Sequence, residues 1–164
     1  MSSSGTPAAP PPKKARPGPL DSLGPYISHP ESFPTTVVTH TPGFVAVRDL
    51  YPKSVVHLLL LPRDTAKTRL HPFEAFEDAE FLRAVRAEAA ALTRLAAAEL
   101  RRRFGDQGGR DWEREVKVGV HARPSMSHLH VHVISRDHHS ERLKTAKHYS
   151  EFGGGGGRRV LAGG

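Results

Sequence analysis

The chain contains no cysteine among its 164 residues. This absence excludes disulfide bonds and thiolate metal sites within the sequence. Aromatic residues make up only 7% of the chain. No apolar run approaches the roughly 20 residues that a membrane-spanning helix needs, so no membrane partner is expected. The length nevertheless suffices for one domain with its own hydrophobic core.

Acidic residues are also scarce, since 17 of them face 24 basic residues and the net charge is +7. Residues 1–18 contain no acid at all, and they are rich in Pro, Ser and Ala. We expect them to form a disordered basic tail, and Pro12–Pro17 has the composition of a nuclear import signal. A basic surplus favours polyanionic partners such as nucleic acid, but it is equally compatible with a surface that serves solubility.

Hydrophobic periodicity predicts an α+β domain over residues 19–152, followed by a flexible Gly-rich tail at 153–164. Apolar segments bounded by turn residues predict strands, and spacings of three to five predict a long helix that breaks near Glu77 and Asp78. The strands are expected at 37–41, 44–50, 54–61, 113–120 and 128–135, and the helices at 20–28 and 72–104.

Three histidines at alternate positions, His128, His130 and His132, have apolar residues between them. On a strand this spacing places all three imidazoles on one face. A neutral imidazole is a good nucleophile, and its second nitrogen can donate a hydrogen bond to phosphate. The middle histidine can therefore attack phosphorus while its neighbours hold the non-bridging oxygens. The hydroxyls and N–H groups of residues 124–127 can cradle an oxyanion.

Two other interpretations of this segment remain open. The first is a surface strand whose histidines have no common role. The second is a metal site, because two histidines at i and i+2 together with a third ligand can bind zinc. His128 and His132 would be about 13 Å apart on a strand, so one ion cannot take all three. A remote ligand such as His121 or His57 would be needed.

The segment from His128 to Ile134 matches the signature of the histidine triad family, in which three histidines alternate with apolar residues. Residues 44–63 resemble the strand–turn–strand that precedes the long helix in this family, and residues 118–128 and 135–152 specifically resemble its aprataxin-like branch. The resemblance implies an antiparallel sheet of about five strands, with a long helix and a short N-terminal helix packed on it. It also implies a hydrolase that removes AMP from the 5′-adenylated DNA ends left by abortive ligation, through a covalent adenylyl-histidine intermediate.

The same resemblance implies roles for individual residues. His130 would attack the AMP phosphorus, His121 would protonate or stabilise the leaving DNA phosphate, and His128 and His132 would position the nucleophile and bind phosphate oxygens. The implied nucleotide-binding residues are Asp49, Leu50, Ser125 and Ser127. The implied DNA-binding residues are Lys53, His57, Met126, Lys147 and His148. Simpler roles stay open for several of these positions: turn capping for Asp49, a solvated turn charge for Lys53, and a hydrogen-bonded strand histidine for His57.

Aprataxin-like proteins carry a C-terminal zinc finger that grips DNA, and this sequence offers no cysteine for one. Either the chain is a catalytic core without that finger or the finger has been lost. No metal or cofactor is expected in this chain. The expected partners are DNA with adenylated 5′ ends and AMP, with a monomeric enzyme in the nucleus. The alternatives are a general nucleoside phosphoramidate or dinucleotide hydrolase, and a non-catalytic nucleic-acid-binding module.

Overall fold

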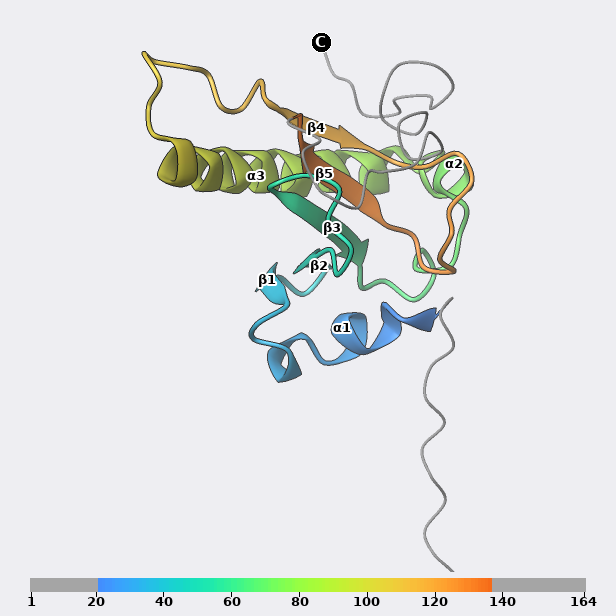
Figure 1. The fold of residues 1–164 in the computed structure, drawn as a ribbon. Helices are drawn as coiled ribbons and strands as arrows, with labels where there is room; N and C mark the ends of the chain where they lie inside the picture. Colours follow the sequence, from blue (N-terminus) through green and yellow to red (C-terminus); the bar gives the residue numbers. More distant parts are fainter. Residues whose placement is uncertain (1–20, 137–164) are drawn as a thin grey trace, which may run out of the picture.

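The computed structural model describes residues 21–136, so the two predicted tails lie outside the described residues. Within this range a five-stranded sheet carries helices on both of its faces (Figure 1). The strands are β1 (Val37–His40), β2 (Phe44–Arg48), β3 (His57–Pro62), β4 (Val116–Gly119) and β5 (Val131–Ser135). The helices are α1 (Gly24–Ser28), the 3-10 turn η2 (Pro30–Ser32), α2 (Pro72–Ala75) and α3 (Ala79–Phe104). No described helix has the length and apolar character that crossing a bilayer requires.

The strand order is β1-β2-β3-β5-β4, and every neighbouring pair is antiparallel. The predicted α+β class and the five-stranded antiparallel sheet are thereby confirmed. The order brings β5 between β3 and β4, with His132 opposite Leu59 on one side and opposite Gly119 on the other. Residues directly opposite each other in an antiparallel pair share a face. The central position of β5 therefore places His132 between residues of two other strands.

The two faces of the sheet have separate cores. Alternate residues such as Ala46, Leu58 and Val133 pack against α3. The intervening positions, among them Val47 and Leu59, pack against Leu23 and Ile27 of α1 and the residues just before it. Because strand side chains alternate between faces and Val133 packs on α3, the neighbouring His132 of β5 points away from α3. The long helix thus supports the sheet from behind and leaves the α1 face for the site.

The strand that carries the triad is shorter than the sequence predicts. It begins at Val131 rather than at His128, because the backbone N–H of Leu129 donates to the carbonyl of Thr68 (2.8 Å) and not to β3. Residues 128–130 are therefore held by the segment that follows β3. The alternation of apolar and histidine residues cannot reveal this change of partner, since Leu129 stays buried in either arrangement.

The predicted break in the long helix is confirmed between α2 and α3. The Asp78 carboxylate accepts from the N–H groups of Glu80 and Phe81 (both 3.0 Å), which caps α3 at its start. The predicted apolar face of α3 is buried at Val85, Ala89, Leu92 and Ala96. Phe73 in α2 belongs to the same predicted spacing but remains 42% exposed, whereas Phe76 is buried.

Candidate active site

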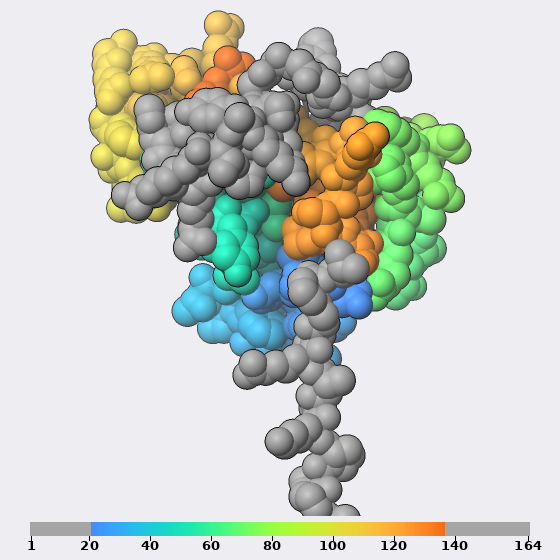
Figure 2. Space-filling view, turned by 45° about the vertical axis from the view of Figure 1, so that its right-hand side comes forward, coloured from blue at the N-terminus to red at the C-terminus, as the bar shows by residue number. Residues whose placement is uncertain are grey.

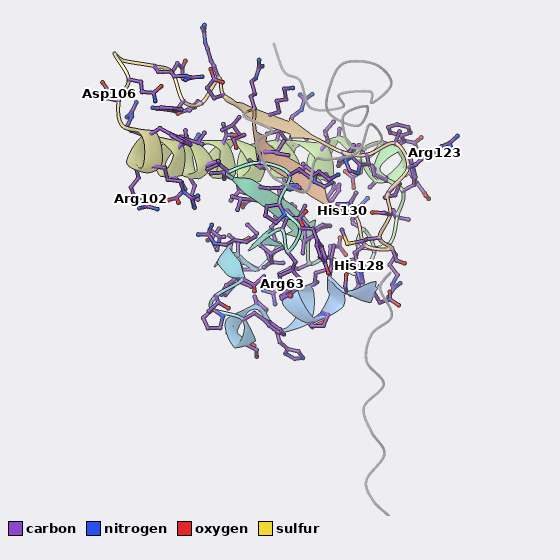
Figure 3. The ribbon with its side chains drawn as sticks, viewed as in Figure 1. Arg63, Arg102, Asp106, Arg123, His128 and His130 are labelled. Atoms are coloured by element: carbon purple, nitrogen blue, oxygen red, sulfur yellow. The ribbon has the colours of Figure 1, made fainter. Side chains whose placement is uncertain are left out.

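The triad lies on the face of the sheet that α1 shares, at the end of β5 nearest to that helix. Figure 3 shows His128 and His130 close to α1, whereas Arg102 and Asp106 lie far away at the other end of α3. In the space-filling view the orange segment around residues 120–130 lies between the teal residues before β3 and the green residues that lead into α2 (Figure 2). Four separate stretches of chain therefore meet around the histidines.

His132 is held by a second histidine that comes from β3. Nε2 of His57 lies 2.8 Å from Nδ1 of His132, and both rings are buried. Nδ1 of His57 accepts from the backbone N–H of Lys53 (3.2 Å), so the neutral His57 ring carries its proton on Nε2 and donates it to His132. His132 consequently carries its own proton on Nε2. This chain of hydrogen bonds gives the triad a fixed donor.

His130 has the opposite tautomer. Its Nδ1 lies 2.7 Å from the carbonyl oxygen of His128, an oxygen that can only accept. The proton of the neutral ring therefore sits on Nδ1, and Nε2 keeps its lone pair. A donor on His132 and a lone pair on His130 lie side by side, with ring centroids 5.0 Å apart. Attack on phosphorus requires a lone pair on the nucleophile and a donor that stabilises charge on a phosphate oxygen, and these two rings provide both.

His121, which follows β4, completes the cluster of rings. It stacks on His132 with 4.2 Å between centroids and an interplanar angle of 26°, and its ring centroid lies 6.4 Å from that of His130. A small pocket, called here the His130 pocket, lies beside these rings. Its lining comprises Leu70, Pro72, His121, Pro124, Met126, Ser127, His128, Leu129 and His130. His121 thus faces the same space as the nucleophile candidate.

Burial lowers the pKa of every histidine in the cluster whose shift is resolved. Desolvation lowers the pKa of His57 to about 4, although the Asp49 carboxylate opposes the shift. Desolvation likewise lowers the pKa of His130, while its hydrogen bond to His128 and the charge of Asp49 oppose the change. The pKa of His132 lies well below its ordinary value for the same reason, reinforced by the neighbouring imidazoles. The rings are therefore neutral at pH 7, the state in which imidazole is nucleophilic.

Asp49 serves both the turn and the site. Its Oδ1 accepts from the backbone N–H of Tyr51 (2.7 Å), which is the capping role considered from the sequence. Its Oδ2 lies 3.4 Å from Nε2 of His57. Lys53 in the same turn lowers the pKa of His57 and His130, so the two charges oppose each other at the cluster. Leu50 lies between them in sequence and is 59% exposed.

His57 lies deeper than the resemblance implies. A side chain that faces DNA would be open to solvent, but the His57 side chain is fully buried and both of its nitrogens are engaged. The hydrogen-bonded strand histidine considered from the sequence describes its position better. From the neighbouring strand β3, His57 donates a hydrogen bond to His132.

The predicted site residues in the loop before the triad lie in different surroundings. Ser127 and Met126 line the His130 pocket, and Met126 also packs beside the α1 core. Ser125 is exposed and lies outside that lining. The ring of His128 packs on α1, since a Cβ at Gly24 would lie 3.6 Å from its Cε1 and Nε2. Lys147 and His148 fall outside the described residues.

The positions of the histidine rings are compatible with the metal site considered from the sequence. Ligand atoms of His121, His130 and His132 all lie within 4.8 Å of one another, and so do those of Asp49, His57 and His132. The second set is already joined by the 2.8 Å hydrogen bond between two rings. An ion in the first set would need the lone pair of His130, and it would compete with nucleophilic attack at that atom.

Two supporting residues were not predicted from the sequence. The carbonyl of Thr68 accepts from the N–H of Leu129 and so holds the backbone just before His130. His71 contacts the loop after β4, since its Nε2 lies 3.2 Å from the carbonyl oxygen of Ala122. A carbonyl partner leaves no mark on the sequence, so only the folded chain reveals these contacts.

The site can now be compared with known proteins. A family model described as the scavenger mRNA decapping enzyme C-terminal binding region matches residues 25–148. An aprataxin-like protein of Saccharomyces cerevisiae is 35% identical over 151 residues, which cover 79% of this chain and 67% of that protein. The chain belongs to the aprataxin-like proteins. The resemblance drawn from the triad and its flanking segments is therefore confirmed.

Another aprataxin-like protein, from Schizosaccharomyces pombe, is 38% identical over 135 residues. These residues cover 80% of this chain and 58% of that relative, so the chain spans less than two thirds of it. The crystal structure of the aprataxin ortholog Hnt3 in complex with DNA has a TM-score of 0.70 and 38% identity. Its alignment covers 81% of this aprataxin-like chain and 68% of Hnt3. A structure of Hnt3 in complex with DNA and guanosine matches with the same TM-score.

Proposed function

We propose that this aprataxin-like chain hydrolyses the bond between AMP and the 5′ phosphate of adenylated DNA. The observation that carries the proposal is the pair of opposed tautomers at the triad. The carbonyl of His128 keeps the lone pair of His130 on Nε2, and His57 keeps the donor of His132 on its own Nε2. The structures of Hnt3 with DNA, and with DNA and guanosine, support a polynucleotide as the substrate.

The reaction would run in two displacements at the AMP phosphorus. Nε2 of His130 attacks, a P–N bond forms, and the bond from phosphorus to the bridging oxygen breaks. The DNA 5′ phosphate leaves with that oxygen and the electron pair, and His121 supplies a proton to it or stabilises its charge. Nε2–H of His132 donates to a non-bridging oxygen as negative charge develops there. A water molecule then attacks the phosphorus and gives a proton to His121 or to solvent, the P–N bond breaks, and AMP leaves as His130 recovers its lone pair.

The charged residues around the rings fit the two halves of such a substrate. The Asp49 carboxylate suits two ribose hydroxyls, because an ionised carboxylate only accepts hydrogen bonds. Lys53, which lies in the same turn as Asp49, would contact the DNA end together with Met126, and Ser127 would bind phosphate; Met126 and Ser127 both line the His130 pocket. Lys147 and His148 would contact the DNA backbone, and Ser125 would contact phosphate from the exposed part of its loop. The enzyme would act as a monomer in the nucleus without a metal or cofactor of its own.

The direct test incubates the protein with a nicked duplex that carries a 5′-adenylate. Wild type should release AMP and restore the 5′ phosphate. The His130→Ala variant should bind the duplex with near-normal affinity but release no AMP. His40→Ala, which changes an exposed histidine of β1 far from the triad in sequence, is the matched control and should keep activity. Mass spectrometry of acid-quenched reactions should find AMP on His130 in the wild type.

Substrate preference separates the alternatives. Adenylated DNA should be turned over far faster than an AMP-amine compound. Equal catalytic efficiencies on the two would favour a general phosphoramidate or dinucleotide hydrolase and would overturn the DNA assignment. If the wild type binds the duplex and releases no AMP from either substrate, the chain is a non-catalytic binding module.

A further inference from the structure

A histidine outside the triad connects α2 to the loop that carries His121. Nδ1 of His71 accepts from the backbone N–H of Phe73 (3.2 Å), which caps α2. A ring nitrogen that accepts from an N–H carries no proton, so the neutral His71 ring holds its proton on Nε2. That nitrogen lies 3.2 Å from the carbonyl oxygen of Ala122 and therefore donates to it. One ring thus satisfies two backbone groups that are 49 residues apart in the chain (73 against 122).

The contact falls next to the residue that faces the nucleophile. Ala122 follows His121 directly, and His121 stacks on His132 at 4.2 Å. The sequence neighbours of His71, Leu70 and Pro72, line the His130 pocket together with residues of that loop. The residues from Ala122 to Pro124 are exposed, so packing contributes little to holding the loop in place. The bond from His71 is therefore well placed to set the position of the His121 backbone.

We propose that His71 is a positioning residue: its Nε2–H donates to the Ala122 carbonyl and holds His121 over the AMP phosphorus and its leaving oxygen. It acts through His121 and touches no substrate atom. The inference rests on the proposed function for its effect on turnover. Its structural part, the fixed position of His121, can be measured without any substrate. Misplacing a reacting group by about 1 Å can lower a rate by about 100-fold, so a displaced His121 should lower turnover measurably.

Two substitutions separate the contact with Ala122 from the cap of α2. In His71→Asn the short amide can still accept from the Phe73 N–H, because Asn is a good N-cap residue, but it does not reach Ala122. In His71→Gln the longer amide places an N–H near the position of Nε2, and the cap is lost. His71→Ala loses both contacts. Asp78→Ala, which removes the cap of α3, controls for a general loss of helix stability.

The proposal predicts that turnover of adenylated nicked DNA follows the Ala122 contact. His71→Asn and His71→Ala should lower kcat by about tenfold with little change in KM, since an off-position group adjacent to the chemistry loses rate rather than binding. His71→Gln should stay within about threefold of the wild type. Asp78→Ala should lower the melting temperature without lowering kcat. The opposite order, with Asn active and Gln inactive, would mean that only the cap matters, and the proposal would fall.

Nuclear magnetic resonance of the histidine rings gives the readout that needs no substrate. The ring ¹⁵N shifts of wild-type His71 should show the proton on Nε2. The ring signals of His121 should move in His71→Asn and His71→Ala and should keep their wild-type positions in His71→Gln. Unmoved His121 signals in all three variants would refute the positioning role. A wild type with these ring signals and no AMP release would refute the proposed function and leave the positioning of His121 intact.

Discussion

The low pKa of His57 predicts that the protein loses stability on mild acidification. The unfolded chain gives His57 its ordinary pKa of 6.5, whereas burial in the folded protein lowers it to about 4. Between these values the unfolded state binds the extra proton, so the free energy of unfolding falls as the pH falls. At roughly 1.4 kcal/mol per pH unit, the full interval corresponds to about 3 kcal/mol, and pH 5 already costs about 2 kcal/mol. Above pH 6.5 both states are neutral and the effect vanishes.

The assay compares wild type with His57→Gln by urea unfolding at pH 7, 6, 5 and 4.5. His57→Gln lowers stability at pH 7, because the Lys53 N–H loses its acceptor. It also removes the group that titrates. The free energy of unfolding of His57→Gln should therefore fall less steeply as the pH is lowered. The difference in this free energy between the wild type and the variant should narrow by about 2 kcal/mol between pH 7 and pH 5.

Parallel stability curves for the two proteins would refute this reasoning. They would mean that His57 takes up its proton in the folded state as easily as in the unfolded chain. A His57 ring that protonates this easily would not hold His132 in the tautomer that makes it the donor of the triad.

The charges beside the rings, the core under α3 and the need for a metal ion can each be tested. Asp49→Asn should shift the acid limb of the kcat/KM profile to lower pH, because the carboxylate raises the pKa of His57 and His130; Lys53→Met should shift it to higher pH, because the ammonium lowers both. A pH profile in which both variants move the limb the same way would contradict the assignment. Leu60→Ala should cost about 2–5 kcal/mol in urea unfolding, since Leu60 is 1% exposed in the core under α3 and its loss leaves a cavity; a loss below 1 kcal/mol, on the order of a surface change, would show that the core collapses around it. Turnover should survive EDTA, and a loss of activity that zinc restores would favour an ion held by His121, His130 and His132.

The fold was predictable from the sequence to the extent that local patterns decide it. Turn residues with Pro and Gly separate the first three strands, and Asp78 begins the long helix as an N-cap residue should. The ends of several elements were not predictable. β3 begins at His57 rather than at residue 54, where the hydroxyl of Ser54 turns back to the carbonyl of Val56 (2.8 Å). Such local hydrogen bonds compete with a sheet ladder, and apolar patterning does not report them.

The candidate site was likewise predictable from the sequence only in part. The alternating triad predicted that its histidines lie together in a site, and the family resemblance predicted Asp49 and Lys53 beside them. His57 was expected to face DNA, and the structure buries it behind His132. Its role depends on the pairing of β3 with β5, where two rings 75 residues apart come within 2.8 Å. The carbonyl of Thr68 accepts from Leu129 and the ring of His71 donates to the carbonyl of Ala122; since every residue has a backbone carbonyl, no sequence pattern marks these contacts.

The sequence by itself determined that three imidazoles occur in strict alternation within an apolar segment, and that this segment belongs to a phosphate-handling family. Residue types and their spacing suffice for that, since a strand repeats every two residues. Only the tertiary structure decided which nitrogen of each ring carries the proton. That choice depends on the backbone N–H of Lys53 and the carbonyl of His128, and a tautomer is fixed by whatever lies within hydrogen-bond distance of its ring.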